Sequence, residues 1–397
     1  MRLGSRSERP EMKADIVLLS TADWDNPFWT NKQHVAVELA RRGHRVLYID
    51  SLGLRRPSAS AQDFARIAKR LLRGLRPPRR VREGVWVWSP LVIPLQRHAF
   101  VRNLNRWSLR AGLRLWSRWL HLRHDLLWTY NPMTMRLFPT ASFATVVYHC
   151  VDEIEAQRGM PSREIGAAEE QLLAAASYCF VTAEHLLRTR RALCSSIHYF
   201  PNVADFDHFA RARDAHTQIP DDLAKLPSPR IGFVGAISDH KLDLTLLRRL
   251  AEAHPEWSIV LIGKVGEGDP WTNIESLRGL PNLHLLGPKP YEALPAYLKG
   301  FDAAILPAAI NDYTRGMFPM KFFEYLAAGC PVVSTALPAL HDFGNVATLA
   351  ETHGDFVAGV ERTLHGDGPT LATRLAVARE HTYERRTARM MQLLEAR

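Results

Sequence analysis

Residues 319–335 predict a helix that stops at a glycine and leads directly into a short apolar strand. The apolar side chains of this stretch recur at helical spacing and define one buried face: Phe322, Phe323, Leu326 and Ala327. Gly329 is placed to end the helix in a left-handed turn, and Pro331 and Val332 begin the strand. Because helices that lead into parallel strands build α/β sheets, this stretch predicts an α/β fold.

Two charged side chains lie near the start of the predicted helix. Lys321 and Glu324 are three positions apart and therefore share one helix face. Backbone N–H groups and the helix dipole already favour an anion at a helix N-terminus. A cation and a carboxylate at this place suit a ligand that carries both phosphates and hydroxyls. The alternative is an ordinary amphipathic crossover helix.

Length and cysteine content narrow the possibilities further. A chain of 397 residues is too long for one compact core, and an apolar fraction of 46% is that of a globular protein, so we expect two domains. The absence of any C-x-x-C spacing argues against a disulfide framework or a structural zinc site. A reducing cytoplasm is the simplest compartment. The cysteines are Cys150, Cys179, Cys194 and Cys330.

The sequence predicts neither a signal peptide nor a membrane span. Residues up to Lys13 are polar and charged, and the apolar run at 16–19 is much shorter than a signal-peptide core. No apolar run approaches the roughly 18 residues of a spanning helix. Any membrane contact is therefore expected to be peripheral.

The formal charge of +10 is concentrated in one segment. Residues 55–123 contain 17 Lys or Arg against only Asp63 and Glu83, so this segment carries +15 while the rest of the chain nets about −5. Such asymmetry predicts an anionic partner. Nucleic acid is the competing anion, but no helix-turn-helix, zinc-finger or RNA-recognition pattern accompanies the charge, so we do not expect nucleic acid to be bound.

Two basic helices are predicted in this segment, at 66–76 and at 98–120. In the second helix, arginine recurs every four residues beside tryptophans, and Leu109 and Leu113 belong to an apolar face. Since guanidinium groups meet lipid phosphates and indoles sit at headgroup depth, this helix predicts contact with an anionic membrane surface. The alternative is a solvated arginine face. The residues expected at the membrane are Arg102, Arg106, Trp107, Arg110, Arg114, Trp116, Arg118 and Trp119.

The first half of the chain alternates strands and helices as a parallel sheet does. The expected strands are 15–20, 45–50, 85–88, 126–129, 144–149 and 178–182, and the expected helices include one from Thr30 or Asn31 to Gly43 and one at 184–191. The loop after the first strand is aromatic and acidic, and open parallel sheets bind ligands at that edge. Its ligand-contact candidates are Asp23, Trp24, Asp25 and Trp29. The alternative is that the tryptophans only cover the helix.

The second half has the same alternation. A polar, proline-bearing run at 211–229 predicts a linker. The strand that follows, 230–234, leads into a turn at Gly235. Further strands are expected at 258–262, 283–286 and 303–306, and terminal helices at 371–397.

Several of these stretches together resemble the GT-B glycosyltransferases. Lys-x-x-Glu-Tyr-Leu-Ala-Ala-Gly-x-Pro-Val-Val, which starts at Lys321, is similar to the donor-binding helix of that family. Leu-Ala-Arg-Arg-Gly-His-Arg-Val, from Leu39, is similar to its opening, and Pro-Asn-Val-Ala-Asp, from Pro201, to its passage between domains. The resemblance implies an α/β fold of two Rossmann-like, doubly wound parallel-sheet domains that face a cleft.

The same resemblance implies where the domains begin and end. An N-terminal acceptor-binding and membrane-binding domain is expected at 1–210, a linker at 211–229 and the nucleotide-sugar donor domain at 230–370. The helices at 371–397 are expected to pack back on the N-terminal domain.

The resemblance also implies a donor site for a UDP- or GDP-sugar in the second domain. Lys241 and Lys321 are the cations expected to meet the diphosphate, and Glu324 is expected to hold ribose or sugar hydroxyls. Ala236 stands where relatives have an arginine, and Gly316 stands where many have the second glutamate of the retaining members. The expected donor-binding residues are Gly235, Lys241, Gly263, Lys289, Met320, Lys321 and Glu324.

Glycosyl transfer with inversion needs a base for the attacking hydroxyl and stabilisation of the leaving diphosphate. Asp152 follows the predicted strand at 144–149 and resembles the catalytic aspartate of inverting glucuronosyltransferases that build lipid-linked exopolysaccharide units. We therefore expect Asp152 to be the base. Glu153, Asp23 and Asp25 are rivals, and the alternative role for Asp152 is a helix cap.

Two Asp-x-Asp patterns, at 23–25 and 205–207, spell the metal-binding motif of the other glycosyltransferase class. Neither is followed by the mixed-sheet pattern of that class. The lysines at the expected donor site make a metal unnecessary, so we expect no metal site and no cofactor besides the nucleotide-sugar substrate.

The sequence thus predicts a metal-independent glycosyltransferase of the bacterial exopolysaccharide or teichuronic-acid type. Its expected acceptor is lipid-linked or a glycan, and its expected place is the cytoplasm, peripheral on the inner face of the plasma membrane. Two other interpretations stay open. One is a retaining transferase of the same fold, and the other is a nonenzymatic basic protein that binds membrane or nucleic acid.

Overall fold

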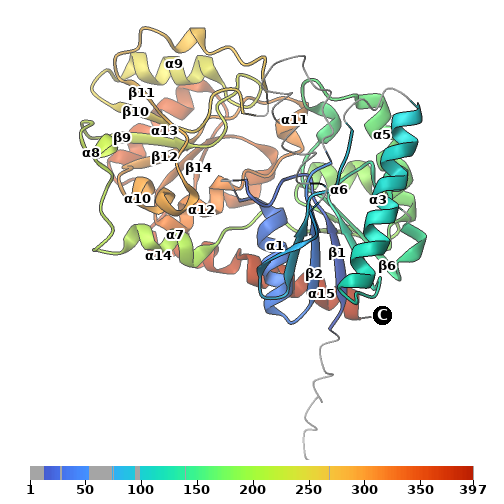
Figure 1. The fold of residues 1–397 in the computed structure, drawn as a ribbon. Helices are drawn as coiled ribbons and strands as arrows, with labels where there is room; N and C mark the ends of the chain where they lie inside the picture. The colour runs from blue at the N-terminus through green and yellow to red at the C-terminus, as the bar shows by residue number, and fades with distance from the viewer. Residues whose placement is uncertain are drawn as a thin grey trace, which may run out of the picture.

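Two sheets, one in each half of the chain, organise the molecule (Figure 1). The computed structural model describes residues 13–26, 29–52, 74, 76–93, 99–138, 140–267 and 269–396. The basic helix expected at 66–76 lies almost entirely outside these residues. Over the rest, the predicted pair of α/β domains is confirmed.

The first sheet has, within the described residues, eight strands in the order β3-β4-β2-β1-β5-β6-β7-β8. Neighbouring strands are parallel except for the edge pair β3 and β4. The strands are β1 (Asp15–Leu19), β2 (Arg45–Ile49), β3 (Arg79–Arg82), β4 (Val85–Trp88), β5 (Leu126–Thr129), β6 (Thr145–Cys150), β7 (Tyr178–Val181) and β8 (Ile197–Tyr199). All six strands expected here are present, and their ends differ from the prediction by one residue at most.

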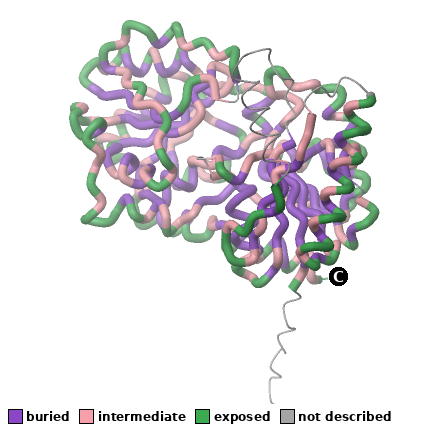
Figure 2. Tube along the Cα trace, in the orientation of Figure 1, coloured by how far each residue is buried: buried purple, intermediate pink, exposed green. Residues whose placement is uncertain are grey.

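The second sheet is parallel, and its described part has six strands in the order β11-β10-β9-β12-β13-β14. They are β9 (Arg230–Val234), β10 (Ser258–Ile262), β11 (Leu283–Gly287), β12 (Ala303–Leu306), β13 (Val332–Thr335) and β14 (Thr348–Ala350). The central strands of both sheets are buried at every residue or at all but one (Figure 2), because helices cover both faces of a parallel sheet. These strands are β1, β2, β4, β5, β6, β7, β9, β10, β12 and β13.

The α-helices connect the strands and cover the sheets (Figure 1). They are α1 (Asn31–Arg41), α3 (Ala99–Trp119), α4 (Thr134–Leu137), α5 (Ser162–Ala175), α6 (Glu184–Arg190), α7 (Phe206–Ala210), α8 (Asp221–Ala224), α9 (Leu244–Ala253), α10 (Leu294–Lys299), α11 (Asp312–Arg315), α12 (Lys321–Ala328), α13 (His353–Leu364), α14 (Leu371–Glu380) and α15 (Tyr383–Glu395). Short 3₁₀ turns are η1 (Thr140–Ser142), η2 (Ile154–Ala156), η3 (Arg211–Arg213), η4 (Glu275–Leu277), η5 (Tyr291–Ala293) and η6 (Pro338–Phe343).

The second domain begins earlier than the sequence predicts. Ala204, Phe209, Ala212 and Leu223 are buried in the same apolar core as strand β9. The segment expected to be a linker, 211–229, therefore belongs to the second domain. The segment was predicted as a linker because most of its residues are polar, although a few apolar side chains anchor it in the core.

The chain crosses between the domains twice, at neighbouring places. Ala204 forms a parallel bridge with Thr382, and the N–H of Ala204 donates to the carbonyl of His381 at 3.1 Å. After this second crossing, α15 packs on α1, and its Met390 and Met391 enter the core of the first domain. The predicted return of the terminal helices therefore holds for α15, whereas α14 packs on α12 of the second domain.

Candidate functional site

Helix α12 begins and ends where the sequence predicts. Met320 lies just before its first turn, and Gly329 ends it with a left-handed φ of 90°. A Cβ atom at Gly329 would also lie 3.0 Å from the side chain of Leu371, so both backbone angle and space favour glycine. The N-terminus of α12 is thereby fixed at the carboxyl edge of the second sheet.

Lys321 and Glu324 form an ion pair at this N-terminus, with Nζ of Lys321 2.6 Å from Oε2 of Glu324. The Glu324 side chain is 5% exposed and that of Lys321 is 25% exposed. Burial raises the pKa of Glu324, and the charge of Lys321 opposes that rise. Lys321 also acts on His34 in α1 of the first domain, so the pair faces across the gap between the domains.

Glycines line the ends of the neighbouring strands. The N–H of Gly235 donates to Ile262 at 2.9 Å, and the N–H of Gly263 donates to Gly287 at 3.0 Å. A Cβ atom at Gly263, which has a φ of 155°, would lie 1.8 Å from the carbonyl oxygen of Gly235. Gly235 and Gly263 therefore lie at the edge of the sheet as expected, but Gly263 is required by the close approach of two backbone segments.

The two remaining lysines of the expected donor site behave differently. The Lys241 ammonium lies 5.5 Å from the ring centroid of Tyr313, and its charge acts on Asp152 of the first domain. Lys289 instead bonds Asp222 at 2.6 Å and lies over the ring of Tyr297. The donor contact expected at Lys289 is one of the backbone of its loop, 287–291, so this contact stays a prediction.

Asp152 lies two residues beyond β6 and is partly exposed. Burial raises its pKa, and the charges of Lys32 and Lys241 lower it. These two lysines belong to different domains, so the carboxylate of Asp152 faces the region where the domains meet. The helix-cap alternative is wrong: Glu153 precedes η2, and that position makes no side-chain capping bond.

The rival base Glu153 is committed to a buried ion pair. Its carboxylate accepts from both terminal nitrogens of Arg190, which also bonds Glu169 at 3.0 Å. Asp25, another rival, pairs with Arg79 on β3. The backbone carbonyl of Asp23 accepts from Asn26 and Gln33 in the loop before α1. Glu153 and Asp25 are thus engaged in ion pairs, and the choice of Asp152 as the base stays a prediction.

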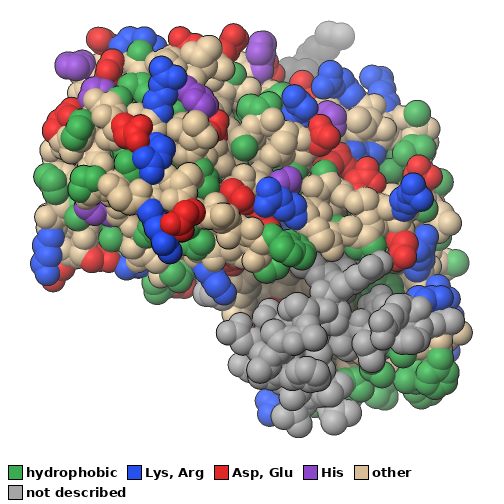
Figure 3. Space-filling model, turned by 90° about the horizontal axis from the view of Figure 1, so that it is seen from above, with side chains coloured by type: hydrophobic (Ala, Val, Ile, Leu, Met, Phe, Trp, Pro, Cys, Tyr) green, Lys and Arg blue, Asp and Glu red, His purple; other side chains and the backbone are tan. Residues whose placement is uncertain are grey.

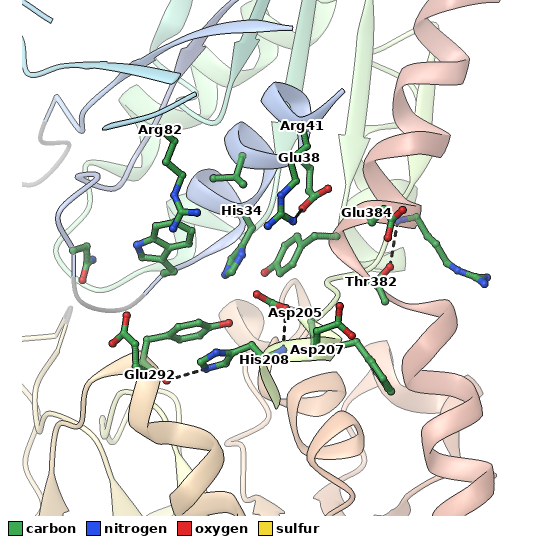
Figure 4. A pocket seen from close by; sticks show the side chains of 18 of the residues that line it. His34, Glu38, Arg41, Arg82, Asp205, Asp207, His208, Glu292, Thr382 and Glu384 are labelled. Carbon is green, nitrogen blue, oxygen red and sulfur yellow. Dashed lines mark hydrogen bonds and ion pairs between the residues drawn. The ribbon is translucent and has the colours of Figure 1, made fainter. Parts of the chain in front are cut away.

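A pocket of about 820 Å³ lies between α1, the start of α15 and the second domain. Figure 4 shows His34 pointing from α1 into the pocket above Asp205 and His208. The ring of His34 stacks on Tyr383 with centroids 4.1 Å apart, and His208 stacks on Tyr291 at 4.2 Å. Burial, chiefly, lowers the pKa of His34 to about 3, so its ring is neutral.

The aromatic loop after β1 contributes to this pocket. Trp29 meets His34 edge-on, and the guanidinium of Arg82 lies 5.0 Å from the Trp29 ring centroid. Trp24 is 7% exposed and packs edge-on against Tyr48 in the core. Trp24, Asp25 and Trp29 all line the pocket, and their contact with an acceptor stays a prediction.

The pocket and Asp152 lie on different sides of the start of α1. His34 lines the pocket, whereas Lys32 faces Asp152. Two positions along an α-helix differ by about 200° around its axis. The structure therefore does not bring the aromatic loop and the expected base to one place.

Helix α3 begins and ends within one residue of the predicted range, 98–120. Leu109 and Leu113 are buried in the first core, and Trp116 packs against that core. Arg106 is partly buried and donates from Nε to the carbonyl of Arg136. The side chains of Trp116 and Arg106 therefore contact the rest of the protein. The exposed residues of the predicted set are Arg102, Trp107, Arg110, Arg114, Arg118 and Trp119.

The exposed side of α3 carries an apolar stripe in which three further residues, Phe100, Leu104 and Leu115, join the predicted Trp107 and Trp119. The side chain of Phe100 is 76% exposed and that of Trp107 is 69% exposed. Figure 3 shows hydrophobic side chains beside Lys or Arg side chains at the right-hand edge, on the side where α3 lies. Throughout the described part of the chain, no helix is long and apolar enough to cross a bilayer.

Lys32, His34 and Tyr383 are site residues that sequence reasoning missed. The sequence does mark Lys32 as unusual, because a cation at the second position of a helix interacts unfavourably with the helix dipole. His34 and Tyr383 come together only through the second crossing, for which no local pattern exists. Among the described residues, no group of three His, Cys, Asp or Glu side chains is arranged to hold a metal ion.

Comparison with known families identifies the second domain. The family described as "Glycosyl transferases group 1" matches residues 228–365, from just before β9 to the end of α13. These residues form a glycosyl transferases group 1 domain. The match contains the Lys321–Glu324 pair, Lys241 and the glycines at the strand ends.

A curated relative matches beyond this group 1 domain. The chain is 28% identical over 261 residues to the Bacillus subtilis protein named teichuronic acid biosynthesis glycosyltransferase TuaH. The match covers 61% of this chain, and the chain spans 64% of the length of that relative.

Solved glycosyltransferases share the complete two-domain architecture. Sucrose-phosphate synthase from Thermosynechococcus elongatus superposes with a TM-score of 0.67 at 16% identity, covering 97% of this chain and 99% of the other. Trehalose 6-phosphate synthase from Burkholderia multivorans gives 0.68 at 13% identity and 97% of both chains. Anabaena HepE, solved with UDP, gives 0.62 at 14% identity, 97% of this chain and 100% of its own. The expected GT-B fold is confirmed.

Proposed function

We propose that this protein is a metal-independent glycosyltransferase that moves a sugar from a nucleotide diphosphate to a membrane-associated acceptor. The observation that carries the proposal is the Lys321–Glu324 ion pair at the N-terminus of α12, which faces α1 of the other domain. A diphosphate suits the helix N-terminus and the lysine, and hydroxyls suit the carboxylate. UDP is the favoured nucleotide, because HepE, of the same fold, binds it.

The positive groups of the second domain support a reaction without a metal. As the bond between the sugar and the diphosphate breaks, the leaving phosphate gains negative charge. Lys321, Lys241 and the N–H groups at the start of α12 stabilise that charge. No cofactor is needed besides the nucleotide sugar.

Inversion follows if Asp152 acts as the base. The acceptor hydroxyl gives its proton to the Asp152 carboxylate, its oxygen bonds the anomeric carbon, and the diphosphate leaves with the electron pair. The contact between Gly316 and Glu153 supports inversion, because the space where retaining relatives carry a second glutamate is filled from the first domain. The charges of Lys32 and Lys241 favour the ionised form of Asp152, which a base requires.

The exposed stripe of α3 supports peripheral attachment to an anionic membrane. Tryptophan and phenylalanine enter the headgroup region, and the neighbouring arginines meet lipid phosphates. Attachment at the inner face of the plasma membrane brings the enzyme to a lipid-linked acceptor and leaves it in the compartment that supplies nucleotide sugars. The name of the B. subtilis relative points to the same class of polysaccharide synthesis.

A screen for nucleotide release tests the function. The protein is incubated with UDP-, GDP- and ADP-sugars, with membrane extract as acceptor, in the presence of EDTA. We expect release of one nucleotide diphosphate and its loss in Lys321→Met. Lys225→Met, which removes an exposed cation just after α8, serves as the control. Activity that disappears in EDTA and returns with manganese would overturn the metal-independent mechanism.

A further inference from the structure

Arg158 of the first domain forms ion pairs with two aspartates of the second domain. Its Nη1 lies 2.7 Å from Oδ1 of Asp239 and 3.4 Å from Oδ2 of Asp269. The side chain of Asp269 is 4% exposed, and it also accepts from the hydroxyl of Ser238 at 2.8 Å. Because a buried carboxylate is costly unless charges and hydrogen bonds compensate it, these contacts matter more than those of an exposed surface pair.

The backbones of the two domains also meet beside Arg158. Gly159 lies against the ring of Trp271, and a Cβ atom at Gly159 would come within 2.3 Å of that ring. The turn η2, just before Arg158 in the chain, packs beside α11 of the second domain. The ion pairs are therefore part of a continuous contact between the domains.

This contact lies at the edge of the domain boundary opposite to the chain crossings. Figure 1 shows α11 at the top of the boundary, whereas the chain passes from α14 to α15 at the bottom. Two domains that are joined at one edge change their relative angle about that edge. An ion pair at the opposite edge acts at the largest distance from the crossings and therefore fixes this angle most effectively.

On the first domain, Arg158 belongs to the same short loop as Asp152, the expected base. The N–H of Ile154 donates to the carbonyl of Asp152 at 3.0 Å, and the N–H of Gln157 donates to the carbonyl of Ile154 at 3.2 Å. These bonds connect the backbone of Asp152 to the residue that precedes Arg158. A displacement of Arg158 therefore moves Asp152 as well.

On the second domain, Asp239 belongs to the turn that carries Lys241, a cation expected at the donor diphosphate. The N–H of Lys241 donates to the carbonyl of Ser238 at 3.0 Å. The carbonyl of Lys241 accepts from the N–H of Ala309, which follows β12, at 2.9 Å. The turn is thus fixed to the edge of the sheet, and Arg158 pairs with a well-held part of the expected donor site.

We infer that Arg158 is a positioning residue for the transfer reaction, which holds the domains closed and fixes the loop of Asp152 against the turn of Lys241. The inference rests on the proposed function and on Asp152 as its base. Without the ion pairs, the domains open about the crossings, and fewer molecules hold the acceptor hydroxyl and the donor in reacting geometry. Arg158 acts through Asp239 and needs no contact with either substrate.

The distance between the domains tests the inference without any substrate. Gln171→Cys on α5 and Ala253→Cys at the end of α9 place spin labels at exposed positions of different domains (Figure 1), whereas the native cysteines are buried. Pulsed electron paramagnetic resonance should give one narrow distance distribution in this background, and a longer and broader one when Arg158→Met is added. Arg163→Met, which removes an exposed arginine of α5, is the control and should leave the distribution unchanged.

Kinetics test the role of Arg158 in the reaction. We expect Arg158→Met to lower kcat/KM about tenfold, which is the effect of losing a hydrogen bond between charged groups. Asp239→Asn should also lower kcat/KM, and the double variant should lose little more than Arg158→Met alone, because both changes remove the same interaction. Arg158→Lys, which keeps the charge, should recover part of the activity, and Arg163→Met should keep all of it.

Three results would overturn the inference. These are an unchanged distance distribution in Arg158→Met, an unchanged kcat/KM in that variant, and additive losses from Arg158→Met and Asp239→Asn, which would mean that Arg158 acts on a substrate directly. A native protein that transfers no sugar refutes the proposed function instead, while the distance distributions still decide whether Arg158 holds the domains closed.

Discussion

Gly316 of the second domain stands directly against Glu153 of the first. A Cβ atom at position 316 would lie 2.9 Å from the Cβ atom of Glu153 and 3.4 Å from its Oε2. Glu153 is held there by Arg190, so it has no room to withdraw. The position at which retaining relatives carry a glutamate is therefore closed here by the other domain.

Gly316→Glu should destabilise the protein without creating a retaining enzyme. Overpacking of this kind costs about 1–3 kcal/mol and forces the domains apart. Thermal unfolding and the anomeric configuration of the product provide the readouts. Gly344→Glu is the matched control, because a Cβ atom there meets nothing within 4 Å. A stable Gly316→Glu that retains configuration would contradict this account.

Asp152→Asn should lower turnover and leave donor binding unchanged. Removal of a general base costs on the order of a hundredfold or more in turnover. Calorimetry with UDP should show unchanged affinity, because the expected donor groups lie on α12 and beside Tyr313. Glu153→Gln is the comparison. It removes a negative charge that pairs with buried Arg190, so it should mainly lower the free energy of unfolding. Near-normal turnover in Asp152→Asn would reassign the base.

Asp50 should make stability depend on pH. It accepts from the N–H of Trp24 at 2.8 Å and from Ser89, and burial raises its pKa to about 6. Since the folded state then holds the proton more tightly than the unfolded state, this group's contribution to stability falls as pH rises from about 4 to 6.

The Asp50 effect can be isolated by substitution. Asp50→Asn should remove a pH-dependent difference on the order of 2–3 kcal/mol between pH 4 and pH 7. Urea unfolding of both proteins at the two pH values measures it. Parallel pH profiles for the native protein and the variant would show that Asp50 titrates normally.

Trp107→Gln and Trp119→Gln should weaken attachment to anionic vesicles. Each removes an indole from the exposed stripe of α3 without touching buried Leu109. Flotation with vesicles of phosphatidylglycerol should show a loss of about tenfold for the pair and a further loss at high salt. Trp271→Gln is the control, since Trp271 is another exposed tryptophan, located on the second domain. Equal binding by all variants would exclude α3 as the attachment surface.

Most of the fold could be predicted from the sequence because its strands are buried on both faces and read as apolar runs. Strand β3 has no such pattern, since Arg79 and Arg80 are exposed at the edge of the sheet. The start of the second domain was misplaced because Phe209 and Leu223 anchor a segment whose other residues are polar.

The candidate site was predictable where one contiguous motif carries it, as for Lys321 and Glu324. It was not predictable where partners come from distant parts of the chain. The ion pair of the Lys289 side chain with Asp222, for example, joins residues from distant parts of the sequence. The stacking of His34 on Tyr383 depends on how α15 docks on α1, which local spacing does not encode.

Helix α15, which follows the second domain in the sequence, completes the core of the first domain. Met390 and Met391 enter the core that β1 begins, so that core stays incomplete until the entire donor domain has left the ribosome. The half that is synthesised first is therefore finished last. A nascent chain that stalls within the donor domain would expose the bare flank of α1 and depend on chaperones for protection.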